Sequence, residues 1–287
     1  MSNKTIKPLI SAEELLTIRH DNNLVLIDTR MGKDIKTIYL ENHLKGALHV
    51  HLNNDLSDIK ENLANGGRHP LPSIEKFSKI LTNLGISPDN HIVIYDDKSA
   101  AIASARLWWM LTAIGHEKVQ VLNGGLKEAL RVGYPTSSGK ETPAKVAPYS
   151  IANWKLPMKT MNEVEKISQD NDYLVIDVRA KERYNGEVEP IDLIAGHIPG
   201  ATNIPFTSTN LDENGLYLEP SILKEKYEKI IGSKPMENVT VHCGSGVTAC
   251  HTLLAMAHAN LEIPNLYVGS WSEWSRNNKT IATNIKQ

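Results

Sequence analysis

Residues 239–258 read VTVHCGSGVTACHTLLAMAH. The first four residues have high β propensity, the loop Cys243–Thr248 follows, and the apolar run from Ala249 to His258 has the character of a helix. The order strand, tight loop, helix is typical of α/β folds, in which helices between apolar strands cover a parallel sheet. The pattern therefore predicts such a sheet, with Cys243 at the end of a buried strand.

The loop after Cys243 is suited to stabilising an anion. Gly244 and Gly246 allow tight turns and a close backbone approach, and successive N–H groups beside a helix N-terminus favour negative charge. The anion would be the thiolate of Cys243 itself, which is the nucleophilic form. A free cysteine is more commonly a small buried hydrophobe, and we interpret Cys250, which has no such loop, in that way. For Cys243 the Gly-Ser-Gly sequence favours the nucleophile.

The sequence Cys-Gly-Ser-Gly-Val-Thr-Ala at residues 243–249 resembles the active-site loop of the two-domain sulfurtransferases of the rhodanese superfamily, in their 3-mercaptopyruvate form. In the thiosulfate form, the two residues after the cysteine are typically Arg and Lys. The resemblance implies a catalytic Cys243 and two tandem rhodanese-like domains. It also implies that the loop residues contact substrate: Gly244, Ser245, Gly246, Val247 and Thr248.

Chain length and composition fit this interpretation. The 287 residues suffice for two domains of about 140 residues, each with its own core. A hydrophobic content of 41%, a charged content of 22% and a net charge of −2 are ordinary for a soluble protein and give no electrostatic case for nucleic acid or anionic membrane. Two cysteines without a CxxC pair argue against a disulfide scaffold and a thiolate zinc site.

No targeting or membrane segment is visible. Residues Met1–Pro8 lack an apolar core of signal-peptide length, and no apolar run approaches about 18 residues. Together with the free cysteines, this predicts a cytoplasmic protein.

An internal duplication runs through the chain. Residues 173–179 match 24–30, with Asp177 on Asp28 and Arg179 on Arg30, and three further pairs follow in the same order: 197–201 on 43–47, 239–243 on 92–96, and 266–270 on 121–125. Capping boxes precede the first strand of each copy, at 11–14 and 160–163. We therefore predict two α/β domains, each a parallel sheet with helices on both faces, at residues 1–138 and 158–287. The linker between them, at 139–157, lies in a stretch from Tyr134 to Pro157 that is rich in Pro, Ser, Thr and Lys.

The two copies differ where Cys243 lies. The first copy has Asp96 at this position, and the next three residues, Asp97-Lys98-Ser99, include no glycine. A carboxylate among N–H donors would compete with a bound anion, so we predict that the N-terminal domain is catalytically inactive. Because the pairs Asp28/Arg30 and Asp177/Arg179 occur in both copies, we interpret them as fold-stabilising.

The resemblance assigns further roles. Arg183, in an Arg-Tyr-x-Gly pattern, matches the substrate-binding arginine of the family, whose planar fork suits a carboxylate or sulfonate. The mercaptopyruvate branch usually has a second arginine shortly after an acidic-Pro pair, but here Glu189-Pro190 is followed by Ile191 and Asp192.

The same branch has a Ser-His-Asp set proposed to assist proton transfer. Ser245 and His69 match it, and Asp55 is the candidate carboxylate, with Asn53 as the alternative if the alignment shifts. The histidines at 242, 251 and 258 have no metal-ligand spacing, and the C-terminal signature at 269–274 is interpreted as packing near the rim of the active site.

The predicted reaction is a ping-pong transfer of sulfur from 3-mercaptopyruvate through a Cys243 persulfide to cyanide, a thiol or a thioredoxin-like acceptor. It requires no metal or organic cofactor, and no nucleic acid or membrane partner is expected. Alternatives are a thiosulfate:cyanide sulfurtransferase and a non-catalytic persulfide carrier or binding module. A cysteine phosphatase would need an arginine at the end of the loop, where this chain has Ala249.

Overall fold

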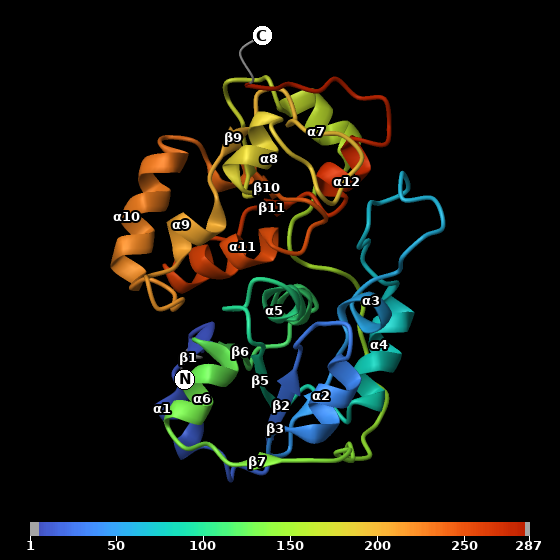
Figure 1. The fold of residues 1–287 in the computed structure, drawn as a ribbon, viewed down its shortest axis with the longest axis vertical. Coiled ribbons are helices and arrows are strands. Elements are labelled where there is room, and N and C mark those ends of the chain that lie inside the picture. The colour runs from blue at the N-terminus through green and yellow to red at the C-terminus, as the bar shows by residue number, and fades with distance from the viewer. Residues whose placement is uncertain (1–5, 285–287) are drawn as a thin grey trace. The chain divides into compact units, whose positions relative to one another are not determined.

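Three of the four matched segment pairs of the duplication form equivalent strands of two parallel sheets in the computed structural model, which describes residues 6–284. The fourth pair, 43–47 and 197–201, does not. The first sheet contains β1 (Leu9–Ile10), β2 (Leu24–Asp28), β4 (Leu48–His49), β5 (His91–Tyr95) and β6 (Val119–Leu122), and the second contains β8 (Leu174–Asp177), β9 (Thr202–Asn203), β10 (Val239–His242) and β11 (Asn265–Leu266). The strand orders are β1-β6-β5-β2-β4 and β11-β10-β8-β9. The predicted α/β fold and its duplication are confirmed (Figure 1).

Two short strands, β3 (His43–Leu44) and β7 (Thr136–Ser137), form a separate antiparallel pair. The helices up to residue 131 are α1 (Ala12–Thr17), α2 (Ile35–Glu41), α3 (Leu52–Asp55), α4 (Ile74–Asn83), α5 (Ala103–Ala113) and α6 (Gly125–Arg131). Those after residue 160 are α7 (Met161–Ile167), α8 (Lys181–Asn185), α9 (Phe206–Asn210), α10 (Pro220–Ile231), the 3₁₀ turn η1 (Met236–Asn238), α11 (Ala249–His258) and α12 (Ser270–Trp274). Both predicted capping boxes are present, at Ser11/Glu14 and Thr160/Glu163.

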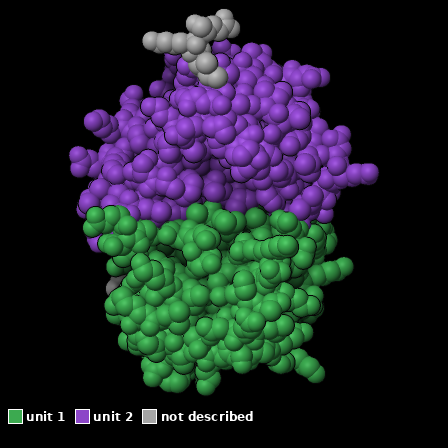
Figure 2. Space-filling model, viewed as in Figure 1, with its two compact units in different colours: residues 1–56, 72–155, 213–217 green, residues 57–71, 156–212, 218–287 purple. Residues whose placement is uncertain are grey.

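The chain divides into two compact units, and each unit consists of segments that are not contiguous in sequence (Figure 2). Unit 1 comprises residues 1–56, 72–155 and 213–217, and unit 2 comprises residues 57–71, 156–212 and 218–287. The segment 57–71, which lies between α3 and α4 in sequence, thus belongs to the unit that contains Cys243. The boundaries 1–138, 139–157 and 158–287 stay a prediction. Residues 1–5, part of the segment without a signal-peptide core, lie outside the described residues.

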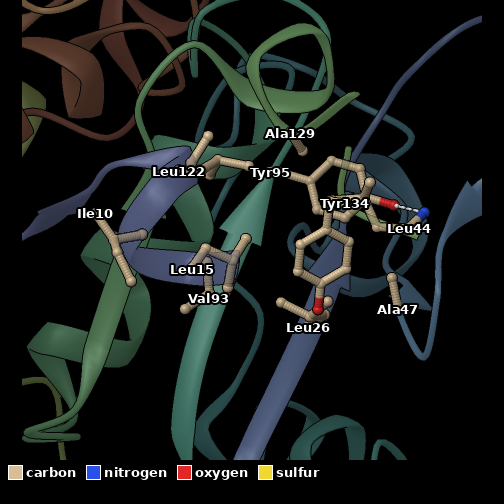
Figure 3. Packing of buried hydrophobic residues seen from close by; sticks show 11 residues of the cluster. Ile10, Leu15, Leu26, Leu44, Ala47, Val93, Tyr95, Leu122, Ala129 and Tyr134 are labelled. Atoms are coloured by element: carbon tan, nitrogen blue, oxygen red, sulfur yellow. Dashed lines mark hydrogen bonds between the residues drawn. The ribbon is translucent and has the colours of Figure 1, made fainter. Parts of the chain in front are cut away.

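The core of unit 1 is layered on its sheet. Alternate residues of β2 and β5, among them Leu26, Val93 and Tyr95, pack with Leu15 of α1 and Ala129 of α6 on one face (Figure 3). Helix α5 packs on the other side, against β5 and β6 (Figure 1). Strands buried on both faces explain the continuous apolar runs that identified them in the sequence.

Unit 2 repeats this arrangement. Val164 of α7, Tyr184 of α8 and Trp271 of α12 pack with Val175 of β8 in one buried cluster. Helix α11 contacts β10 and also packs against α9 and α10. Along residues 6–284, no helix combines the length and hydrophobicity needed to cross a bilayer.

The duplicated aspartate and arginine form the same buried ion pair in both units. Arg30 Nη2 lies 2.7 Å from Asp28 Oδ2, and Arg179 Nη2 lies 2.6 Å from Asp177 Oδ2. Each guanidinium also donates to a backbone carbonyl, that of Asn42 in unit 1 and that of Gly196 in unit 2. The pairs link the end of a central strand to the loop beyond it, as expected for a fold-stabilising role.

Candidate active site

Cys243 directly follows β10, and helix α11 begins six residues later at Ala249. It is only 1% exposed, and its backbone faces α12: its N–H donates to Ser270 Oγ at 3.2 Å, and its carbonyl accepts from Trp271 N at 3.0 Å. The next carbonyl, that of Gly244, accepts from Ser272 N at 2.8 Å. The start of the loop is therefore fixed by backbone bonds to one short helix.

The second loop glycine is required by its surroundings. Gly246 has φ of 70°, and a Cβ there would lie 2.3 Å from the carbonyl oxygen of Val268. Val247 is buried, and Thr248 occupies the N-cap position of α11. Cys250 is fully buried in α11 and directs its Sγ at the Gly246 carbonyl at 3.4 Å, as expected for a packing residue.

The sequence-predicted pair Ser245 and His69 lies together within unit 2. His69 Nδ1 is 2.8 Å from Ser245 Oγ, although the two residues are 176 positions apart. Segment 57–71 is attached to α12 by two backbone donors: Gly66 N–H to Glu273 Oε1 and Arg68 N–H to Ser272 Oγ, each at 3.0 Å. These bonds place the His69 ring against the active-site loop.

A network of arginines and carboxylates lies beside Gly244. We call it the arginine network, and its members are Arg68, Arg179, Arg183, Arg276, Asp177, Glu189 and Asp192. A Cβ on Gly244 would lie 2.9 Å from Arg68 Nη2 and 3.5 Å from both Arg183 Nη2 and Asp192 Oδ2. Two guanidinium groups therefore reach the residue that follows Cys243.

Arg183, the predicted substrate-binding arginine, is 16% exposed at its side chain. Its Nε and Nη2 donate to Glu189, and Nη2 also donates to Asp192 Oδ2 at 3.2 Å. These carboxylates fix the direction of the guanidinium, whose Nη2 lies near Gly244. Asp192, which follows Glu189-Pro190 where the mercaptopyruvate branch usually has an arginine, is thus an acceptor for the cations of this site.

His242 immediately precedes Cys243 and is fully buried. Burial lowers the pKa of its imidazole and outweighs Asp177, whose Oδ2 lies 3.7 Å from Nε2. The ring is therefore neutral at neutral pH. In unit 1 the equivalent residue, Tyr95, donates its hydroxyl to Asp28 Oδ2 at 2.9 Å. The side chain at this position thus lies beside the buried aspartate in both units.

Comparison with known proteins agrees with this architecture. The family model of the rhodanese-like domain matches twice, at residues 11–131 and 160–277. The chain belongs to the rhodanese family. Each match falls within one of the two domains predicted from the sequence, so the chain has two rhodanese-like domains in tandem.

Rhodanese-family relatives of known name are similar over most of the chain. A probable 3-mercaptopyruvate sulfurtransferase of Pseudomonas aeruginosa is 35% identical over 274 residues, covering 93% of this chain and 94% of the relative. A thiosulfate sulfurtransferase of Rattus norvegicus is 35% identical over 246 residues, covering 83% and 79%. SseA from Escherichia coli, described as showing the rhodanese fold of 3-mercaptopyruvate sulfotransferases, is 31% identical with a TM-score of 0.77, covering 93% and 100%. The chain is a sulfurtransferase.

The first rhodanese-like domain has Asp96 where the second has Cys243. Asp96 Oδ1 accepts the N–H groups of Lys98 and Ala100, both at 2.9 Å. Burial raises the pKa of this carboxyl group and outweighs the two N–H donors. The Asp96 side chain thus accepts N–H groups of the loop after β5 and would compete with a bound anion for them. This is consistent with the predicted inactivity of the N-terminal domain.

The candidate carboxylate of the Ser-His-Asp set lies in α3 of the first rhodanese-like domain. Asp55 Oδ2 accepts the backbone N–H of His51 at 2.7 Å, and the Asn53 N–H donates to His51 Nδ1 at 3.2 Å. Both residues belong to unit 1, whereas His69 belongs to unit 2. The third member of the set stays a prediction.

Neither Arg68 nor Arg276 lies in a sequence pattern that predicts a site residue, and Asp192 is visible in the sequence only as a departure from the family pattern. The bonds between Arg68 and Asp192 span 124 positions, so no local pattern indicates them. The one available signal was the position of Arg68 directly before His69.

Proposed function

We propose that this sulfurtransferase takes the thiol sulfur of 3-mercaptopyruvate, carries it as the outer, sulfane sulfur of a persulfide on Cys243, and delivers it to a thiophilic acceptor such as cyanide, a small thiol or a thioredoxin-like protein. The observation that carries the proposal is the position of Cys243 at the start of a glycine loop, with two guanidinium groups beside Gly244. The donor carboxylate would bind these cations while its sulfur meets the thiolate.

The first half-reaction breaks one bond and forms one. The Cys243 thiolate attacks the donor sulfur, the bond between sulfur and C3 breaks, and its electron pair forms the enolate of pyruvate. The enolate takes a proton at carbon, formally the one that the donor thiol brought, so that Cys243 persulfide anion and pyruvate result. In the second half-reaction a nucleophilic acceptor attacks the outer sulfur, and Cys243 leaves as the thiolate. With cyanide the product is thiocyanate.

The donor is tested by comparing kcat/KM for 3-mercaptopyruvate and thiosulfate with cyanide as the acceptor. We expect the value for 3-mercaptopyruvate to be at least about tenfold higher, a difference of about 1.4 kcal/mol in transition-state stabilisation. The reason is that the thiosulfate form typically has Arg and Lys after the cysteine, whereas Gly244 and Ser245 carry no charge here. A preference for thiosulfate would overturn the donor assignment in favour of the thiosulfate:cyanide reaction. A carrier would load once and release no pyruvate in the steady state.

We further propose that Ser245 and His69, together with Asp55, move the proton that the enolate needs. The contact of 2.8 Å between His69 Nδ1 and Ser245 Oγ supports a shared role. We expect Ser245→Ala and His69→Gln each to lower kcat for 3-mercaptopyruvate by roughly 10²-fold, with little further loss in the double variant, because both act in one proton transfer. Asp55→Asn should act in the same direction. If the losses from the two single variants multiply in the double variant, or if kcat stays unchanged, the set has no joint function.

A further inference from the structure

Arg68 lies beside the residue that follows Cys243, although no family pattern pointed to it. Its Nη2 lies closer to the Cβ position of Gly244, at 2.9 Å, than the Nη2 of Arg183, at 3.5 Å. Its side chain is 22% exposed, and its backbone N–H is anchored on Ser272. A guanidinium has five N–H donors, so the two that bond to Asp192 leave others for the carboxylate of a donor.

Asp192 holds this guanidinium in place. Its carboxylate side chain is fully buried, with Oδ1 accepting from Arg68 Nε at 2.9 Å and Arg276 Nη1 at 3.1 Å. Its Oδ2 accepts from Arg183 Nη2 at 3.2 Å and from Arg68 Nη2 at 3.3 Å. Burial of a carboxylate is tolerated only with such pairing. Because one carboxylate joins Arg68 to Arg183, it fixes both guanidinium groups beside Gly244.

The arginine network has a small net charge. It contains four guanidinium groups and three carboxylates among the described residues, and His242, which contacts Asp177, is neutral because burial lowers its pKa. The formal surplus is a single positive charge. The Cys243 thiolate offsets this surplus, so a monoanionic donor adds one negative charge to a largely buried site, whereas a dianion would add two without a matching cation.

We propose that Arg68 is a second donor-binding residue that takes the donor carboxylate together with Arg183, and that Asp192 is a positioning residue whose charge restricts the site to monoanionic donors. The identity of the donor rests on the proposed function, but the charge selection does not. The experiment therefore measures whether the site around Cys243 favours an anionic reagent over a neutral one, and it involves no sulfur transfer.

The test compares the rates at which iodoacetate, an anion, and iodoacetamide, its neutral analogue, alkylate Cys243 in the full chain. In either reaction the thiolate displaces iodide, a carbon–sulfur bond forms, and peptide mapping separates Cys243 from Cys250. We expect Arg68→Gln to lower the ratio of the iodoacetate rate to the iodoacetamide rate by about tenfold, since a charge-assisted hydrogen bond is lost. Arg68→Lys, which keeps the charge, should restore most of the ratio. Asp192→Asn should raise it several-fold.

The matched control is Lys279→Gln. Lys279 is a cation of the same unit that pairs with Glu165 outside the arginine network, so the ratio should not change. An unchanged ratio in Arg68→Gln, or an equal fall for both reagents, would overturn the proposal.

Donor kinetics give an independent measurement that does not depend on alkylation. For Arg68→Gln we expect KM for 3-mercaptopyruvate to rise about tenfold while kcat stays within about threefold, because the lost bond serves the bound donor before and during the reaction. A fall in kcat without a change in KM would mean that Arg68 does not bind the donor.

If wild-type protein does not turn over 3-mercaptopyruvate and yet the alkylation ratio responds as predicted, the donor assignment fails and charge selection stands. If turnover is normal and the ratio does not respond, the proposal for Arg68 and Asp192 fails and the donor assignment stands.

Discussion

Replacing Cys243 by alanine will lower the rate of pyruvate formation from 3-mercaptopyruvate by about four orders of magnitude or more. The reason is that the proposed reaction passes through a covalent bond to this sulfur, and no other side chain can accept the transferred atom at the same point of the loop. The measurement is steady-state pyruvate release with cyanide as the acceptor, at enzyme concentrations high enough to detect a residual rate.

The chain supplies a matched control in its second cysteine. Cys250 lies seven residues later, fully buried in α11 with its Sγ against the Gly246 carbonyl. Cys250→Ala should keep kcat within about threefold, since it removes only a buried packing contact. Turnover that survives in Cys243→Ala but is lost in Cys250→Ala would mean that Cys250, and not Cys243, is the nucleophile.

Replacing Arg179 by glutamine will destabilise the protein by about 3–5 kcal/mol, because it leaves the fully buried carboxylate of Asp177 without its cation. Burial alone would raise the pKa of Asp177, but the adjacent Arg179 guanidinium outweighs it and keeps the pKa below its ordinary value. The loss should appear as a lower free energy of unfolding in urea at pH 7. Arg131→Gln is the control, since its ion pair with Glu13 is more than half exposed and should contribute less than about 1 kcal/mol.

The sign of the pH dependence follows from the same pair. A carboxyl group whose pKa is lowered in the folded state stabilises the fold above its unfolded pKa of about 3.9, and this contribution is lost as the pH falls through the folded value. In Arg179→Gln the buried Asp177 has lost its cation, so its pKa is raised instead of lowered. The difference in stability between wild type and variant should therefore be large at pH 7 and shrink as the pH falls from the raised pKa of the variant toward the lowered pKa of the wild type. A difference below about 1 kcal/mol at pH 7 would contradict the structural role that the duplication indicates.

Much of the fold could be predicted because its signals are local. Strands β2, β5 and β6 are continuous apolar runs, and the two capping boxes mark the starts of α1 and α7 within a few residues. The ion pair of Asp177 with Arg179 joins residues two positions apart. Because the same pair of residues recurs in both copies, the sequence alone indicates a fold-stabilising role.

The parts that escaped prediction depend on long-range contacts. Segment 57–71 has an irregular polar sequence, and it belongs to unit 2 because backbone groups of Gly66 and Arg68 bond to side chains of α12 more than 200 positions away. Arg68 and Asp192 meet for the same reason. The family resemblance predicted Cys243, Ser245, His69 and Arg183. Arg68, the proposed second donor-binding residue, is recognised only from the three-dimensional structure.

The most direct test of the central claim is the mass of the intact protein after incubation with 3-mercaptopyruvate in the absence of an acceptor. The account predicts a gain of one sulfur atom that maps to the peptide containing Cys243, is removed by cyanide, and is absent in Cys243→Ala. A wild-type protein that releases pyruvate without gaining sulfur, or a sulfur that is still gained by Cys243→Ala, would contradict it.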